Sequence, residues 1–239
     1  SDTVSYATSS AGVVIDLAHN VVSGGDADGD VLTSIENAIG SDFNDVIASG
    51  AAANALAGGL GVDTLDYSNS NAGVTINLDS NTASGGYAQG DVISGFENLN
   101  GSVFDDQLTG NNLANVVNGG AGNDMLQGFA GDDTLNGGAG NDRLYGGAGA
   151  DILAGGDGVD TADYRYATGG VTVSLLTNTG IGNDAQGDTL SGIENLSGSN
   201  FDDVLTGDAG NNRLVGNEGA DKLYGGAGND LFATGGDGK

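Results

Sequence analysis

The chain has 239 residues, of which 47 are glycine and none is proline, cysteine or tryptophan. These counts exclude collagen, disulfide scaffolds and thiolate metal sites, and no apolar run reaches the twenty residues that a membrane-spanning helix needs. The 33 acids against 5 lysines and arginines give a formal charge of −28, which excludes nucleic acid as a natural partner and predicts that folding requires an added cation, a metal ion.

The first segment in chain order, residues 6–39, is a 34-residue block that recurs at 67–100 and 164–197. Apolar residues alternate with others in each copy, as in Val13-Ile15-Leu17, and this period of two predicts a short strand before a glycine-rich turn. We therefore interpret the blocks as irregular coils of a stack, not as linkers. The copies share one tyrosine, one aspartate and one glutamate: Tyr6, Tyr67 and Tyr164; Asp30, Asp91 and Asp188; Glu36, Glu97 and Glu194. The aspartates suit a turn or a metal site equally, whereas for the glutamates we favour a structural role.

A nine-residue unit fills the segments between the blocks, with three copies over 40–66, seven over 101–163 and four over 198–233. Thirteen of the fourteen copies begin with glycine, and thirteen carry a large apolar residue at the eighth position. The sixth position is asparagine in three copies and aspartate in eleven: Asp45, Asp63, Asp106, Asp124, Asp133, Asp142, Asp151, Asp160, Asp203, Asp221 and Asp230. Three columns that keep one spacing indicate that each nonapeptide is a structural unit.

The unit predicts its own local structure. Glycine at positions 1, 2 and 4 is typical of a turn, and positions 7–9 suit a short strand whose eighth side chain points inward. Two units then make a flattened coil of eighteen residues, and stacked coils form two parallel sheets around a thin core. The predicted fold class is therefore all-β, a parallel β-roll or β-helix solenoid.

A stack of this kind needs a ligand. One buried leucine contributes roughly 1.5–3 kcal/mol, whereas ordering nine residues costs about 9–18 kcal/mol of backbone entropy. Stacking also places the aspartates in a repulsive column, which a divalent cation would make attractive. The donors are carboxylates and carbonyls with a single histidine, His19, and these oxygen ligands favour calcium over zinc, copper and magnesium.

The array over 119–163, with its five consecutive copies in register, resembles the RTX family, the nonapeptide repeats of secreted bacterial toxins, proteases, lipases, epimerases and adhesins. The resemblance implies a β-roll that holds several calcium ions between units n and n+2, by the sixth-position aspartates and by carbonyls of turn positions 1 to 4. Asp124 would then pair with Asp142, Asp133 with Asp151, and Asp142 with Asp160.

The carbonyl ligands implied by the resemblance come from five turns of the long array and two of the last. They are Gly119, Gly120, Ala121 and Gly122; Gly128, Ala130 and Gly131; Gly137, Gly138, Ala139 and Gly140; Gly146, Gly147, Ala148 and Gly149; Gly155, Gly156, Asp157 and Gly158; Gly216 and Gly219; and Gly225, Gly226, Ala227 and Gly228.

Some units depart from the family pattern. Asn54, Asn115 and Asn212 lack the charge of aspartate, so sites that include them should be weaker or empty. Phenylalanine replaces the glycine of position 4 where each block meets its array, at Phe43, Phe104 and Phe201, and we expect a stacking edge there. Gly235-Gly236 is one residue out of register.

The function expected from the resemblance is that of a calcium-binding structural module. We expect it to fold on extracellular calcium after export by a type I secretion system, as part of a larger bacterial toxin, enzyme or adhesin that is secreted or held at the cell surface. Its partners would be calcium, the rest of the parent polypeptide and, during export, the secretion machinery. We expect residues 1–239 to form one solenoid, with blocks at 6–39, 67–100 and 164–197 and arrays at 40–66, 101–163 and 198–239, cut from a larger protein.

Catalysis is not expected, because the sequence has no second histidine, no G-x-S-x-G and no phosphate-binding lysine loop. The alternative function is an accessory module that binds carbohydrate, as in alginate-modifying epimerases. It rests on cationic residues at the outward seventh position (Arg143, Arg213 and Lys222), for which anionic polysaccharide is the matching partner. Ice binding is disfavoured, because position 7 holds no threonine column.

Overall fold

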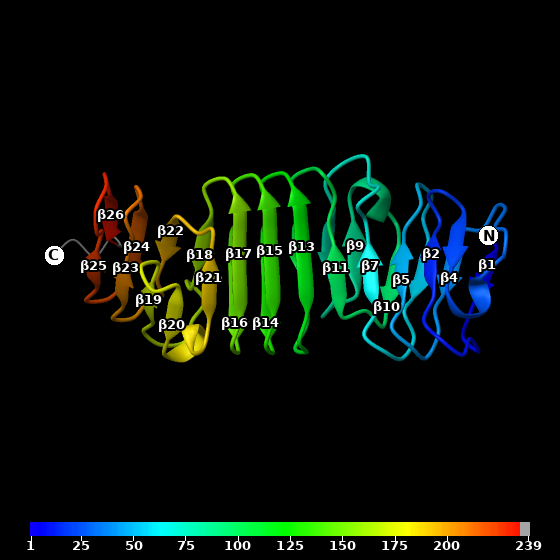
Figure 1. Cartoon of the computed structure of the whole chain (residues 1–239), viewed down its shortest axis with the longest axis horizontal. Coiled ribbons are helices and arrows are strands. Elements are labelled where there is room, and N and C mark those ends of the chain that lie inside the picture. Colours follow the sequence, from blue (N-terminus) through cyan, green and yellow to red (C-terminus); the bar gives the residue numbers. More distant parts are fainter. Residues whose placement is uncertain (235–239) are drawn as a thin grey trace.

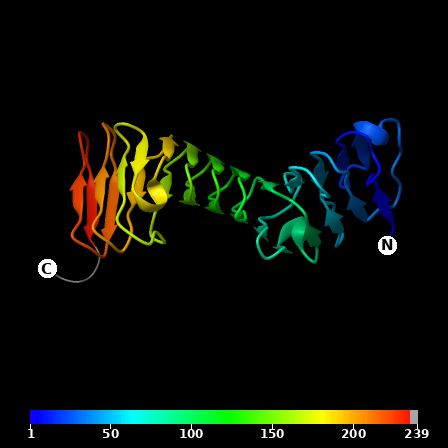
Figure 2. The same cartoon turned by 90° about the horizontal axis from the view of Figure 1, so that it is seen from below.

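A computed structural model of the chain describes residues 1–234 as an elongated stack of β-coils with the two chain ends at opposite ends of the long axis (Figure 1). The described residues contain strands and short 3₁₀ turns, and none of their helices is long and apolar enough to cross a membrane. The view from below shows the same elongated shape (Figure 2). Gly235-Gly236, predicted to be out of register, lies outside the described residues, as does the end of the 198–239 array.

Three sheets run along the stack. The largest has thirteen strands: β2 (Val14–Asp16), β3 (Val21–Ser23), β5 (Val46–Ala48), β7 (Thr64–Asp66), β11 (Asn98–Asn100), β13 (Val116–Ala121), β15 (Thr134–Ala139), β17 (Ile152–Asp157), β19 (Thr172–Ser174), β20 (Thr179–Ile181), β21 (Thr189–Ser191), β23 (Val204–Thr206) and β25 (Lys222–Tyr224). The second has nine: β8 (Thr75–Asn77), β9 (Thr82–Ser84), β12 (Gln107–Thr109), β14 (Met125–Ala130), β16 (Arg143–Ala148), β18 (Thr161–Asp163), β22 (Asn195–Ser197), β24 (Arg213–Asn217) and β26 (Leu231–Thr234). The third has four: β1 (Thr3–Ser5), β4 (Asn37–Ile39), β6 (Ala55–Ala57) and β10 (Val92–Ser94).

The predicted eighteen-residue coil is confirmed by strand register. Where two strands of the long array pair with each other, the paired residues are eighteen apart, such as Val116 with Thr134 and Leu126 with Leu144. Strands β13 to β17 are longer than predicted, because they continue from positions 7–9 through positions 1–3 of the next unit. The parallel β-roll is therefore the fold of this chain.

The core is a single file of aliphatic side chains between the sheets. The eighth-position residue is buried in every unit from Ile47 to Leu214, including the small Ala162. Leu223 is only half-buried and Phe232 is 49% exposed. Both lie at the end of the described stack, where no further described coil covers them.

The 34-residue blocks belong to the same stack. Strand β2 of the first block pairs in parallel with β5 of the following array, and β11 of the second block pairs on both sides, with β7 and β13. Each block adds an antiparallel hairpin that the nonapeptides lack (β2–β3, β8–β9 and β19–β20), followed by a 3₁₀ turn (η1, Gly25–Ala27; η2, Gly86–Ala88; η3, Asn183–Ala185). The blocks and arrays therefore pair with one another along the described residues, and one solenoid over residues 1–239 stays a prediction.

The turns stack so closely that the fourth position is glycine from the third unit of each array onward, although the second unit carries Ala52 in the first array and Leu113 in the long one. Gly140 has a φ of 135°, and a Cβ placed on it would collide with the carbonyl oxygen of Gly122 in the preceding coil. The first turn of each array carries phenylalanine instead, and its backbone lies under the position-4 glycine of the next coil, as Phe104 lies under Gly122. Phenylalanine is therefore accommodated at the start of an array, with its side chain about half exposed.

Candidate metal centre

The sixth-position acids form two lines of buried carboxylates along the stack, each residue directly before a strand. The aspartates of the long array are all 2% exposed or less. One line precedes strands of the nine-stranded sheet and contains Asp106, Asp124, Asp142 and Asp160. The other precedes strands of the thirteen-stranded sheet and contains Asn115, Asp133 and Asp151. Their burial follows from the fold, because each turn is covered by the turns of the coils before and after it.

One oxygen of each carboxylate is held by the backbone of the neighbouring coil. Oδ1 of Asp142 accepts the N–H of Asp124 at 2.8 Å, and Oδ1 of Asp160 accepts the N–H of Asp142 at 2.7 Å. Oδ1 of Asp151 accepts the N–H of Asp133 at 2.9 Å. The structure thus brings together each pair of units n and n+2 for which the resemblance implies a shared ion.

The second oxygen has no partner. Six buried carboxylate oxygens lack a hydrogen bond, the Oδ2 atoms of Asp63, Asp124, Asp133, Asp142, Asp151 and Asp160. Carbonyl oxygens of the next coil approach the same places: a Cβ on Gly119 would meet both Oδ2 of Asp124 and the carbonyl oxygen of Gly137. A buried acceptor without a donor is strongly unfavourable, so each of these places favours a cation.

The electrostatics of the carboxylates agree with this interpretation. Burial is the main cause that raises the pKa of Asp124 and Asp133 to about 7, and neighbouring carboxylates raise it further against the opposing backbone hydrogen bond. The pKa of Asp63, Asp151 and Asp160 is raised to about 6 by the same main cause. Ionising these buried carboxylates therefore costs free energy in this fold, and a bound divalent ion would offset that cost.

The donor set fits calcium. Among residues 1–234 no three Asp, Glu, His or Cys side chains come close enough to hold a metal by themselves. A site in this stack must therefore combine two carboxylates with backbone carbonyls, and such all-oxygen, flexible coordination is what calcium accepts. Position-3 carbonyls already accept one hydrogen bond each, as Ala139 does from the N–H of Gly122 at 2.9 Å, and each keeps a second lone pair.

The first aspartate of each array has a different environment. Ser102 donates to Asp106 through its N–H at 2.5 Å and through its hydroxyl at 2.9 Å, so both carboxylate oxygens are satisfied. Asp45 and Asp203 receive the same two donors from Ser41 and Ser199. Calcium ligation by these three aspartates stays a prediction, but the structure supplies them with protein donors in place of an ion.

Each block aspartate accepts a hydrogen bond from a tyrosine hydroxyl. Tyr67 and Tyr164, both buried, donate their hydroxyls to Oδ2 of Asp91 and Asp188 at 2.9 and 2.8 Å. Tyr6 makes the same bond to Asp30. The tyrosine therefore satisfies the oxygen that is left without a partner in the nonapeptides, and we assign these acids to structure.

The block glutamates continue the acidic lines. Oε2 of Glu97 accepts the N–H of Asp63, and Oε2 of Glu194 accepts the N–H of Asp160, both at 2.8 Å. Each glutamate thus occupies the place of the next aspartate and stands beside an Oδ2 without a partner. Our preference for a purely structural role overlooked this, although a shared spacing of 34 residues from Asp63 to Glu97 and from Asp160 to Glu194 is visible in the sequence.

One coil after each block glutamate, asparagine stands where most units have aspartate. Its amide nitrogen can donate a hydrogen bond, which a carboxylate cannot. Asn115 donates Nδ2 to the carbonyl of Glu97 at 2.7 Å and accepts the N–H of Asn111 with Oδ1. Asn212 makes the same amide bond to Glu194, and Asn54 to Glu36. The three asparagines therefore mark places where a neutral donor, not an ion, joins the coils.

The last array is less enclosed. Asp221 and Asp230 are half-buried, and their Oδ1 atoms accept the N–H groups of Asp203 and Asn212 at 3.0 Å. The turn residues implied by the resemblance, from Gly119 to Gly228, lie on the same turns as their aspartates. The exposed His19 lies outside both lines of carboxylates and contacts Asp16.

Comparison with known families gives one match. The family model of the RTX calcium-binding nonapeptide repeat matches residues 33–68, 91–126, 127–162, 188–221 and 197–232, which together span more than half of the chain. No curated protein matches the chain. The repeats of this family bind calcium, and several copies imply several ions, which agrees with the repeated pairing of buried carboxylates. The chain belongs to the family of proteins with RTX calcium-binding nonapeptide repeats.

Proposed function

We propose that this chain is a structural module that folds when it binds calcium outside the cell, as part of a larger exported bacterial protein. The observation that carries the proposal is the row of buried Oδ2 atoms without partners, which lies where two coils meet. Without an ion the coil must bury these oxygens unsatisfied or protonated. With calcium the same oxygens join one coil to the next.

The proposed ions lie between carboxylates that both lack a partner at Oδ2: Asp124 with Asp142, Asp142 with Asp160, and Asp133 with Asp151. Glu194 and Glu97 extend the set by facing Asp160 and Asp63. The carbonyls of the intervening turns would complete each ligand shell.

This arrangement supports a chain that is unfolded inside the cell and folded outside it. Where calcium is scarce, a chain of net charge −28 resists compaction and stays extended, which suits passage through a type I secretion channel. Outside the cell calcium is about millimolar, within the range of weak extracellular sites, and folding follows. The proposed location is therefore secreted or at the cell surface, and the proposed role is to fold the adjoining toxin, enzyme or adhesin after export.

The direct test is circular dichroism of the chain with and without calcium. We expect a coil spectrum in metal-free buffer at neutral pH and a β spectrum on adding calcium. Full β structure and unchanged thermal stability without metal would overturn the proposal.

Two neighbouring acids provide a matched pair of variants. Asp132 and Asp133 each accept one backbone N–H from another coil, at 2.9 and 2.8 Å, but Asp132 is exposed, whereas Asp133 is buried with Oδ2 unpartnered. Asp133→Asn should raise the calcium concentration at the folding midpoint about tenfold, the effect of losing roughly 1.4 kcal/mol of ligation. Asp132→Asn, which removes the same charge and keeps the acceptor, should leave the midpoint within a factor of two (about 0.4 kcal/mol). Equal effects of the two variants would assign the response to net charge alone.

A second candidate function, binding of an acidic carbohydrate, is favoured by a separate observation. Arg143 and Arg213, both predicted to face outward, line one depression of the surface together with Arg165.

A further inference from the structure

Three of the five lysines and arginines gather in one depression of about 420 Å³ at the junction of the long array and the third block. Arg143 and Arg213 come from β16 and β24, and Arg165 follows β18. The other residues that line the depression are Tyr166, Ser197, Asn200, Val215 and Asn217, and none of them is acidic. In a chain with 33 acids, a hollow lined by three arginines and no carboxylate is a built anion site.

A buried carboxylate below the depression holds two of these arginines in place. Asp163, whose side chain is fully buried, forms ion pairs with Arg165 at 2.7 Å and with Arg143 at 3.3 Å. Arg165 also donates Nε to the same carboxylate at 3.0 Å. A second hollow, which shares Tyr166 with this depression, is lined by Asp163 and also by Asp184. Three guanidinium groups against these two carboxylates leave one positive charge in excess, and both paired arginines remain about one third exposed.

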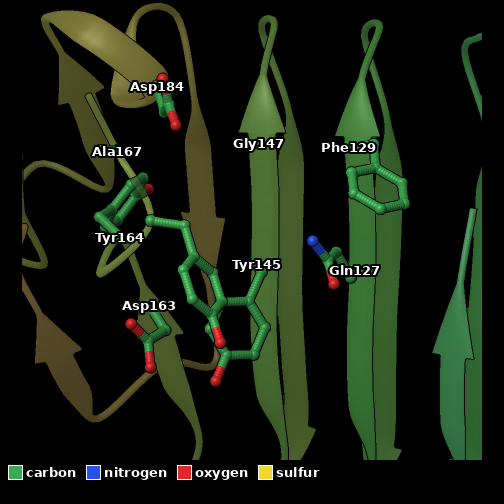
Figure 3. A pocket seen from close by; sticks show the side chains of 9 residues that line it. Gln127, Phe129, Tyr145, Gly147, Asp163, Tyr164, Ala167 and Asp184 are labelled. Carbon is green, nitrogen blue, oxygen red and sulfur yellow. The ribbon is translucent and has the colours of Figure 1, made fainter. Parts of the chain in front are cut away.

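Aromatic rings adjoin the arginines. Tyr166, which is 67% exposed, lines both this depression and a second hollow of about 390 Å³ that is also lined by Phe129 and Tyr145. The rings of Tyr145 and Tyr166 lie 5.5 Å apart, and the guanidinium of Arg165 lies 5.8 Å from the ring centre of Tyr145. Figure 3 shows Phe129 and Tyr145 on neighbouring strands, with Asp163 and Asp184 among the residues that line the same hollow.

The aromatic lining includes a strained residue. Phe129 has a φ of 87°, a conformation that a bulky side chain adopts only at an energetic cost. The units on either side place Gly120 and Gly138 at the same position, with φ near 108°. The repeat thus accepts strain to put an aromatic ring at the edge of the second hollow, and such strain concentrates at binding sites.

We propose that the two hollows form one binding site for a carboxylated carbohydrate, a saccharide containing uronic acid. The proposal rests on the second candidate function and names its ligand class and residues. Arginine forks recognise carboxylates through paired hydrogen bonds, and the exposed face of Tyr166 offers a stacking surface for a sugar ring. Asn200, which is exposed, supplies an amide for sugar hydroxyls in the same depression.

The test is isothermal titration calorimetry of the whole chain, with calcium in excess, against a galacturonic acid tetrasaccharide and its uncharged methyl ester. We expect binding of the acid form and at least tenfold weaker binding of the ester, because the ester cannot form the charge-assisted hydrogen bonds that a carboxylate accepts from arginine. The informative variants are Arg213→Gln and Tyr166→Ala, since both side chains are exposed. Each should weaken binding about tenfold, which corresponds to roughly 1.4 kcal/mol.

The matched controls are Lys222→Gln and Tyr224→Ala on β25 of the thirteen-stranded sheet, which remove the same charge and a ring that is 55% exposed. Both controls should bind as the unchanged chain does. Circular dichroism with calcium identifies any variant that fails to fold, so loss of the site is distinguished from loss of the calcium-dependent module.

Three outcomes would overturn the proposal: no binding by the folded chain, equal binding of acid and ester, or equal loss in the site variants and their controls. If calcium ions bridged the glycan to aspartates, the acid form would still bind, and Arg213→Gln would bind it as tightly as the unchanged chain does. That result would also count against the arginine site. Stronger binding of a glutamate-rich peptide than of the saccharide would replace the carbohydrate by an acidic protein.

Discussion

The two oxygens of each sixth-position aspartate have different tasks. Oδ1 receives a backbone N–H, whereas the partner of Oδ2 differs between places. It is serine in first turns and tyrosine for the block aspartates, and six described aspartates have no protein donor there: Asp63, Asp124, Asp133, Asp142, Asp151 and Asp160. The column of aspartates could be predicted from sequence, because every copy repeats the spacing. The serine and tyrosine donors could not, since Tyr164 and Asp188 are 24 residues apart and only the fold brings them together.

The tyrosine cap should stabilise the stack independently of calcium. Tyr164→Phe removes the hydroxyl that donates to Oδ2 of Asp188, an aspartate whose pKa burial raises to about 7. We expect a loss of about 1–3 kcal/mol in the free energy of unfolding at saturating calcium, the usual effect of leaving a buried acceptor without its donor. Chemical denaturation measures it, and Tyr224→Phe, an exposed ring, is the control. An unchanged stability of Tyr164→Phe would show that this hydroxyl does not hold the block.

At the scale of the element, the distance between coils limits which residues fit in the nonapeptide turn. The sequence predicts the turn and its glycines, but strands β13 to β17 extend through positions 1–3, beyond the predicted positions 7–9. The reason is cooperative, because these turn segments pair as strand against another turn of the same kind in a neighbouring coil, as Gly120-Ala121 does against Gly138-Ala139. The antiparallel hairpins of the blocks were not predicted, because their second strands show little alternation of apolar and polar residues.

Gly140 provides the test of coil spacing. Gly140→Ala adds a methyl group that collides with the carbonyl oxygen of Gly122, at a φ of 135° that side chains rarely adopt. We expect a destabilisation above about 2 kcal/mol, since the positive φ alone contributes roughly 1–2 kcal/mol. Gly29→Ala measures that φ contribution by itself, because Gly29 has a φ of 92° and open space around it. Thermal melts of the two variants in calcium should differ clearly, and equal losses would mean that the coils can move apart.

At the scale of the whole molecule, charge and stacking are coupled. Net charge and the acidic columns are visible in the sequence, but the gathering of Arg143, Arg165 and Arg213 is not, because their shared depression arises from the return of the third block onto the long array. The stack is a row of neighbouring contacts, so its stability grows coil by coil. Each buried carboxylate pair opposes that growth until a cation joins it.

The metal-free chain should therefore show an inverted dependence of stability on pH. Burial raises the pKa of Asp124 and Asp133 from 3.8 to about 7 in the folded state, so folding takes up protons. Stability from such groups is fully present below the unfolded pKa and is lost as pH rises through the folded value. Without metal, the melting temperature should fall between about pH 4 and pH 7.

With calcium the trend should reverse over the same window, because ligation requires the ionised carboxylates. Melting temperatures of chain stripped of metal on a chelating resin, measured with and without added calcium, test both slopes without relying on a chelator that fails in acid. Asp133→Asn should flatten each curve relative to Asp132→Asn, since only Asp133 is buried without a partner at Oδ2. A metal-free melting temperature that rises from pH 4 to pH 7 would show that these carboxylates are not the groups that oppose folding, and the stack would then need another explanation for its demand for calcium.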